Sequence, residues 1–125
     1  MYLYNTYILR TYYVLYTYII LTLNIEKERN FIMYIIGIDI GKNHHEASIV
    51  SPKGRQIGHS LRFATTHKGA DSLISFIFKN IGDSPCVFGM EATGHYWYPI
   101  YSFLKSKGYT IYVINPIQSD SLRKM

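Results

Sequence analysis

The order of the periodic segments after Met33 is the feature that most constrains this chain. Three short segments with apolar or alternating patterns come first, then a helical stripe, a short apolar segment, a second helical segment and a last apolar segment. The strand-like segments lie at residues 34–40, 45–50, 56–64, 86–91 and 110–114. The pattern predicts the order β-β-β-α-β-α-β. Because strands joined by helices are normally parallel, we expect an α/β fold with a mixed sheet: three antiparallel strands, then βαβ units.

The end residues of the two helical segments indicate where the helices begin and end. Thr66 can cap a helix that begins at His67, and Gly82 can end it. Pro99 suits the first turn of the second helix, and Gly108 suits its C-terminal cap. The first helix carries one apolar stripe at helical spacing, made of Ala70, Leu73, Ile74, Ile77 and Ile81. We therefore expect the helices to pack on the sheet faces.

Residues 1–32 differ in composition from the rest of the chain. They hold seven tyrosines and neither Gly nor Pro, whereas Gly and Pro occur regularly after Met33. Their uncharged stretch, residues 11–25, is shorter than the roughly 20 apolar residues that a membrane-spanning helix needs. The alternatives are a membrane-associated segment, or a translated AT-rich stretch upstream of a natural start at Met33. We expect an atypical leader outside the fold and no stable membrane association, with the domain at residues 33–125.

Charge and cysteine content narrow the class of protein. The chain has 13 Lys and Arg against 8 Asp and Glu, a formal net charge of +5, which favours anionic partners such as nucleic acid or a membrane surface. One cysteine, Cys86, excludes an intramolecular disulfide and a cysteine-rich zinc site. Such cysteine usage is typical of a reducing cytoplasm. We expect Cys86 to be a core residue.

Two carboxylates occupy equivalent places in two predicted strands. Asp39 lies near the end of the first strand, Glu91 ends the fourth, and each follows a glycine two residues earlier on the same strand face, Gly37 or Gly89. If the two strands are parallel neighbours, both carboxylates emerge at one sheet edge. Clustered carboxylates repel unless a proton or a cation bridges them, and hard oxygen ligands suit Mg²⁺ or Mn²⁺. A pair of such ions supports phosphodiester cleavage.

Two blocks of this sequence carry a family resemblance. The runs IGIDIGKNHHEASIV and GMEATGHYWYPIYSFLKSKGYTIYVINPIQ resemble the N-terminal part of the DEDD transposases of the Piv and insertion-sequence-110 type. The resemblance covers about residues 33–124, and the phrase MEATG-x-Y with a later V-x-NP distinguishes this family from other proteins that contain GIDIG. It implies an RNase H-like (RuvC-like) catalytic domain that performs metal-dependent DNA strand cleavage and transfer in transposition and recombination.

The resemblance also implies roles for particular residues. Asp39 would be the first acidic ligand of the DEDD set and Glu91 the second, with Mg²⁺ or Mn²⁺ as the cofactor. The family's third and fourth acids come from a Lys-Thr-Asp-x-x-Asp-Ala-like motif, which this sequence lacks; Asp120 stands in a different context. The family's C-terminal domain, with its nucleophilic serine region, is also absent. We therefore expect a truncated transposase that is inactive alone, whose implied partners are DNA, a guide RNA and further copies of itself.

Basic and aromatic residues near these blocks are candidates for contact with nucleic acid. The candidates are Lys42, His95, Tyr96, Lys105 and Lys107, with Trp97, Arg123 and Lys124 as further possibilities. Each has a simpler interpretation, as a solvated charge or as an aromatic that packs under the second helix. We expect His44 and His45 to lie in a turn, to point in different directions and to be solvated.

Two other functions fit parts of the sequence. A non-catalytic remnant that binds nucleic acid or a partner subunit is consistent with the missing acidic pair. A nucleotide-binding domain of the actin and sugar-kinase type would use GIDIGKNHH as its first phosphate loop, but it would also need a later Asp-x-Gly-[Ser/Thr] loop, which the sequence lacks.

Overall fold

The computed structural model describes residues 33–115 of the chain. Its elements, in chain order, are β1 (Tyr34–Asp39), β2 (His44–Val50), β3 (Gln56–Ala64), α2 (His67–Ile81), β4 (Cys86–Glu91), α3 (Tyr98–Ser106) and β5 (Ile111–Ile114). This order is the one that the periodicity predicts, although β2 begins one residue earlier than expected. The leader at residues 1–32, and the predictions for Asp120, Arg123 and Lys124, lie outside the described residues.

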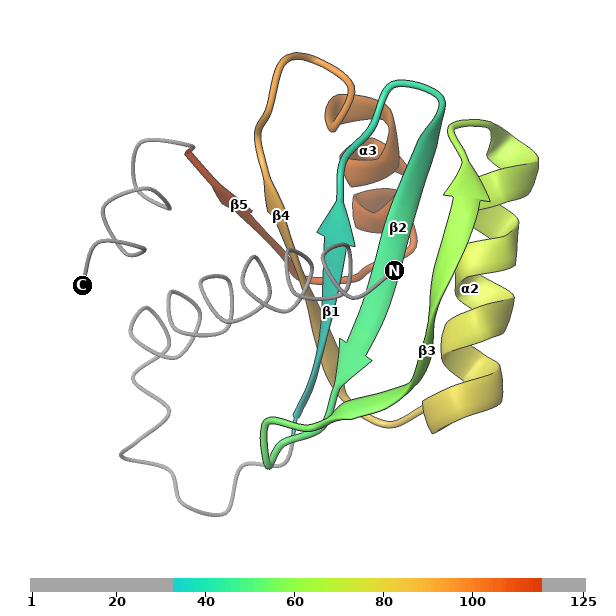
Figure 1. Ribbon diagram of the computed structural model, residues 1–125, viewed down its shortest axis with the longest axis vertical. Coiled ribbons are helices and arrows are strands. Elements are labelled where there is room, and N and C mark those ends of the chain that lie inside the picture. Colours follow the sequence, from blue (N-terminus) through green and yellow to red (C-terminus); the bar gives the residue numbers. More distant parts are fainter. Residues whose placement is uncertain (1–32, 116–125) are drawn as a thin grey trace.

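The five strands form one mixed sheet in the order β3-β2-β1-β4-β5. β1 pairs antiparallel with β2, and β2 pairs antiparallel with β3, so the first three strands are the predicted meander. β4 pairs parallel with both β1 and β5, and Figure 1 shows β4 beside β1 at the centre of the sheet. The α/β fold with an RNase H-like mixed sheet is therefore confirmed, and the condition stated for Asp39 and Glu91, that their two strands are parallel neighbours, is met.

Both described helices pack against one face of the sheet. Ile36 and Ile38 of β1 belong to the same buried cluster as Leu73 of α2 and Leu104 of α3. In Figure 1, α3 lies behind the central strands and α2 runs along β3. The alternate residues of β1 and β4 face the other way, where Ile35 and Val87 form a separate small cluster with the partly buried Met33 and Tyr112. Asp39, which ends β1, and Glu91, which ends β4, alternate with the core residues and therefore lie on the face that the helices do not cover.

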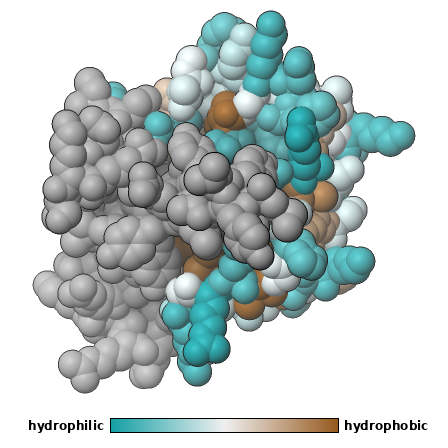
Figure 2. Space-filling model, in the orientation of Figure 1, coloured by the Kyte–Doolittle hydropathy of each residue, from teal (hydrophilic) through white to brown (hydrophobic). Residues whose placement is uncertain are grey.

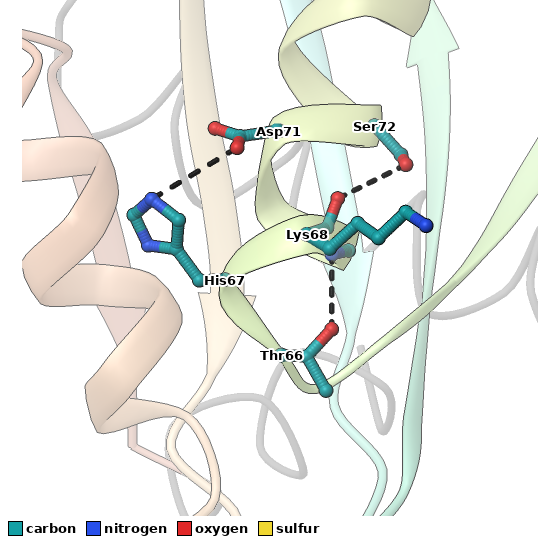
Figure 3. A network of polar contacts seen from close by, with 6 residues as sticks. Thr66, His67, Lys68, Asp71 and Ser72 are labelled. Carbon is teal, nitrogen blue, oxygen red and sulfur yellow. Dashed lines mark hydrogen bonds and ion pairs between the residues drawn. The ribbon is translucent and has the colours of Figure 1, made fainter.

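The start of α2 is fixed by a side-chain cap and by a close backbone approach. The hydroxyl of Thr66 accepts a hydrogen bond from the Gly69 N–H at 3.0 Å, which confirms the predicted cap (Figure 3). Gly69 lies so near the carbonyl of Ala64 that a Cβ there would have no room. The glycine thus lets α2 begin directly against the end of β3. Gly82, with φ of 61°, ends the helix as predicted.

In the coloured part of Figure 2 the surface is mainly polar, and hydrophobic residues appear only in small separate areas among hydrophilic ones. Among residues 33–115, no helix combines the length and the apolar character needed to cross a membrane. Cys86 is half-buried and packs against the main core, as predicted for a core residue, and this burial raises the pKa of its thiol.

Candidate functional site

Asp39 and Glu91 are the last residues of two neighbouring parallel strands. Ile38 of β1 is paired with Met90 of β4, so the next residue of each strand emerges at the same edge of the sheet. Both side chains are half-buried. The prediction that these two residues are neighbours at one edge is confirmed by this register. Their roles as metal ligands stay a prediction.

A third carboxylate, which the sequence analysis missed, lies beside Asp39. Glu46 of β2 is directly paired with Asp39 across the antiparallel ladder. Burial, followed by the negative charges of Glu46 and Glu91, raises the pKa of Asp39 above its ordinary value. The signal that could have identified Glu46 is the short turn after β1, because a tight hairpin fixes which residues of its two strands are opposite.

A pocket of about 210 Å³ lies at Asp39, and we call it the acidic pocket. It is lined by Asp39, Ile40, Gly41, His44, His45, Glu46 and Arg62. Arg62 of β3 is paired with Glu46, so it places a positive charge beside the carboxylates. Within residues 33–115, no group of three or more His, Cys, Asp or Glu side chains is arranged to hold a metal ion.

The expectation that His44 and His45 are both solvated in a turn is wrong for His45. Both lie in β2, and while His44 is exposed, the side chain of His45 is only 3% exposed. Successive strand residues face opposite sides, so His45 turns toward the helices and its neighbours do not. Its Nδ1 accepts a hydrogen bond from the Gly41 N–H at 3.1 Å, and its ring meets Phe63 edge-on. Burial lowers the pKa of His45 to about 4.

The protonation state and the tautomer of the His45 ring follow from its burial and its hydrogen bond. With a pKa of about 4 the imidazole is neutral at physiological pH. A neutral imidazole has one acceptor and one donor nitrogen, and Nδ1 acts as the acceptor toward Gly41. Nε2 therefore carries the proton. Gly41 itself approaches the His44 carbonyl so closely that a Cβ would not fit, so the turn that makes this bond requires glycine.

A second, larger pocket of about 370 Å³ opens between the sheet and the helices, and we call it the aromatic pocket. Residues from the β1–β2 turn, the end of β3, the start of α2, the β4–α3 loop and α3 line it, and none of them is acidic. Three of the five candidates for nucleic-acid contact, Lys42, His95 and Tyr96, are among them. His45 lines this pocket and the acidic pocket alike. The structure thus places in one pocket residues that the sequence analysis named only as separate candidates.

The other two candidates lie apart from these pockets. Lys105 and Lys107 are exposed at the C-terminal end of α3, whereas Glu91 precedes the N-terminal end of that helix. Their Nζ atoms lie 5.5 Å from the ring centres of Tyr101 and Phe103, respectively. Neither lysine lines the acidic or the aromatic pocket. A role for them in nucleic-acid binding stays a prediction, at a distance from the carboxylates.

Comparison with known proteins adds a family and several structural similarities. The transposase family model for the DEDD, insertion-sequence-110 type matches residues 36–125. Thermus thermophilus RuvC in complex with a Holliday junction substrate is 14% identical, with a TM-score of 0.46 over 68% of this chain and 66% of RuvC. A member of the Ppx/GppA family from Aquifex aeolicus is 14% identical, with a TM-score of 0.39 over 69% of this chain and 36% of that one.

A second structure of an Aquifex aeolicus Ppx/GppA enzyme is 16% identical, with a TM-score of 0.37 over 69% of this chain and 37% of that enzyme. The chain therefore spans less than two thirds of the length of each of these structures. No curated protein sequence matches the chain significantly.

Proposed function

The chain belongs to the DEDD transposases of the insertion-sequence-110 type, and we propose that it supplies the first two acidic ligands, Asp39 and Glu91, of a metal-dependent site for DNA strand cleavage and transfer. The observation that carries this proposal is the register of β1 and β4, which puts both residues at one sheet edge. The family match covers both strands. The proposed biological role is transposition and DNA recombination.

The chemistry of the donors fits a divalent cation. Asp39 and Glu91 offer hard carboxylate oxygens, which Mg²⁺ and Mn²⁺ prefer. Asp39 is also partly desolvated and close to two further negative charges, so its ionised form is disfavoured without a counter-charge. A cation bound by Asp39 and Glu91 would supply that counter-charge. When bound, it would supply activation of a water molecule and stabilisation of the leaving oxygen in phosphodiester cleavage.

DNA is the proposed substrate and partner. The family match supports it, and so do the net charge of +5 and the absence of acidic residues from the lining of the aromatic pocket. The family resemblance supports two further proposed partners, a guide RNA and additional copies of the chain. The proposed compartment is the cytoplasm, which the single cysteine suits.

We further propose that the 125-residue chain does not cleave DNA alone. Two ions held in line with a scissile phosphate need more carboxylates than Asp39 and Glu91 provide, and the sequence lacks the motif that would supply the third and fourth acids. Two carboxylates can hold one hydrated Mg²⁺ weakly, because this ion keeps several of its water ligands in proteins. The expected properties are weak metal binding and no nicking.

Calorimetry with Mn²⁺ and a nicking assay on supercoiled DNA test the proposal. The chain should bind Mn²⁺ weakly, and Asp39→Asn should abolish the binding because it removes a charged ligand. Asp83→Asn is the matched control, since Asp83 is an exposed acid that precedes β4, at the opposite edge of the sheet, and its loss should leave Mn²⁺ binding unchanged. Robust Mg²⁺-dependent nicking by the unmodified chain, lost in Asp39→Asn, would contradict the proposed inactivity. Equal Mn²⁺ binding by all three proteins would contradict the metal site.

A further inference from the structure

The aromatic pocket has the size and lining of a site for a flat organic group. Its volume of about 370 Å³ falls in the range of small-molecule pockets, roughly 300–1,000 Å³. Its walls include the buried Phe63 and Ile100 and the partly buried Phe103. Lys42, His95 and Tyr96 lie where it meets solvent, because all three are exposed. Apolar walls with polar groups at the rim are typical of sites that bind a ring with an attached charged group.

His45 gives this pocket a polar group that lacks a partner. Its side chain is 97% buried, and Nδ1 is occupied by the Gly41 N–H. Nε2 therefore has a hydrogen to donate, yet within residues 33–115 it makes no hydrogen bond. Among residues 33–115 no buried side-chain nitrogen or oxygen lacks a hydrogen-bond partner, so the unpaired Nε2 reaches open space, and its N–H is available to a ligand in a pocket that His45 lines.

We propose that the aromatic pocket receives one unstacked base of a nucleic-acid strand, and that His45 Nε2–H donates a hydrogen bond to the edge of that base. This inference rests on the proposed function, in that nucleic acid is the substrate. A base has a face that stacks on aromatic rings and an edge that accepts hydrogen bonds, which matches Phe63, Phe103 and His45. A free phosphate would fit the apolar walls poorly, and a metal ion would meet a protonated nitrogen and no carboxylate.

The groups at the rim suit the backbone on either side of that base. Lys42 brings a positive charge, and His67 at the first position of α2 points toward α3 (Figure 3). The His67 ring meets the Phe103 ring edge-on. Tyr96 and His95 form an exposed ring pair with centres 4.4 Å apart, on which an adjacent base can stack. In this proposal Lys42 and the N-terminal start of α2 contact phosphates, and the exposed ring pair contacts a neighbouring base.

The shared position of His45 gives the bound base a role in the reaction. His45 lines the acidic pocket as well as the aromatic pocket, so a base held at His45 brings the adjoining phosphate toward the edge where Asp39 lies. Lys42, in the turn that joins β1 to β2, lines the aromatic pocket as well. In this arrangement His45 is a positioning residue, since it holds a nucleotide beside the carboxylates and touches no reacting atom.

The test measures binding of short single-stranded DNA by the full chain, in the presence of EDTA. One oligonucleotide carries a fluorescent 2-aminopurine, and a matched one carries an abasic site at the same position. The base-containing oligonucleotide should bind several-fold more tightly, and its 2-aminopurine emission should change on binding. The abasic oligonucleotide keeps the phosphates and loses only the group that the pocket would hold.

Two substitutions of His45 separate its two nitrogens. Asn in His45→Asn can accept from the Gly41 N–H but does not reach the position of Nε2, whereas Gln in His45→Gln extends an amide N–H to that position. His45→Asn should weaken binding of the base-containing oligonucleotide about threefold to tenfold, the range for one neutral hydrogen bond, and should leave the abasic one unchanged. His45→Gln should retain most of the affinity. Thermal melts of both variants report whether each is folded.

Each other outcome overturns the inference. If both oligonucleotides bind equally and folded His45→Asn has no effect, the pocket takes no base, while DNA binding and the proposed function stand. If Tyr96→Ala, an exposed change at the rim, weakens binding of both oligonucleotides equally and the 2-aminopurine emission never changes, the strand contacts the rim alone and no base enters the pocket. If no oligonucleotide binds, the inference fails together with the proposal that DNA is the substrate.

Discussion

The acidic pocket and the aromatic pocket adjoin at His45 and are opposite in chemistry. The acidic pocket contains Asp39 and Glu46 with Arg62 beside them, and the aromatic pocket has apolar walls, a lysine at its rim and no acid. The division follows from strand geometry, because the adjacent residues His45 and Glu46 of β2 face opposite sides of the sheet. The backbone of His45 and Glu46 therefore separates the charged pocket from the apolar one.

The largest expected effect concerns the histidine that both pockets share. The pKa of His45 is lowered from 6.5 to about 4, so the unfolded chain takes up a proton at higher pH than the folded one. The contribution of His45 to stability is therefore fully present above pH 6.5, falls as the pH decreases toward 4, and changes no further below that. The loss should reach about 3 kcal/mol.

Chemical denaturation of the wild type and of His45→Gln between pH 7 and pH 4 measures this loss as the difference between the two proteins. The difference is needed because other groups at these pockets also titrate or carry charge, namely Asp39, Glu46, Arg62, Lys42, His44, His67 and His95. Asp39 acts in the opposite direction, since its raised pKa makes protonation favour the folded state. Parallel stability curves for the two proteins would show that His45 is not held neutral by burial.

A second test disturbs only the aromatic pocket. Gly69→Ala places a Cβ against the Ala64 carbonyl and should push the start of α2 away from β3, at a cost of about 2 kcal/mol in the free energy of unfolding. Asp39 and Glu91, on the face opposite the helices, should keep their Mn²⁺ affinity. Lys68→Ala, an exposed change next to Gly69, is the control and should leave stability nearly unchanged. A Gly69→Ala protein as stable as the wild type would mean that α2 is not seated this closely.

A smaller effect is expected from the cap of α2. Thr66→Ala removes the hydroxyl that accepts from the Gly69 N–H and should lower the free energy of unfolding by about 1 kcal/mol. Thr66→Ser keeps the oxygen and should behave like the wild type. If urea denaturation gives equal stability for the alanine and serine variants, the hydrogen bond does not hold the helix end that lines the aromatic pocket.

The smallest effect is confined to the acidic pocket. Glu46→Gln removes one of the two negative charges that raise the pKa of Asp39, so that pKa should move down toward its ordinary value. Burial, the larger cause, remains, and part of the elevation should remain with it. Carboxyl chemical shifts of Asp39 followed by NMR against pH measure the change. The pKa of His45, set by burial, should not move; a parallel shift there would mean that the two pockets are electrostatically coupled.

Much of the fold is encoded in local sequence patterns. Alternation along residues 34–40 and 86–91 places Asp39 and Glu91 each on the face of its preceding glycine, and Thr66 and Gly82 bound a helix with one apolar stripe. These features depend on residues within a few positions of one another, because strand alternation and helix periodicity are properties of a single backbone segment. For that reason the element order could be predicted from the sequence, whereas the neighbouring ends of β1 and β4 were expected only on the condition that the two strands pair, and the metal-binding role of the two acids stays untested.

Tertiary structure decided the features that depend on distant segments. The pairing of Glu46 with Asp39 needs the register of two strands, and the burial of His45 needs β3 and the helices packed against one face. Lys42, His95 and Tyr96 line one cavity only because the β1–β2 turn and the β4–α3 loop end at the same edge of the sheet. The sequence alone determined which residues could carry charge and which elements would form. Contacts between segments far apart in the chain decided which of these residues share a pocket and which histidine is buried. The reason is that burial and inter-strand register are not properties of any one segment.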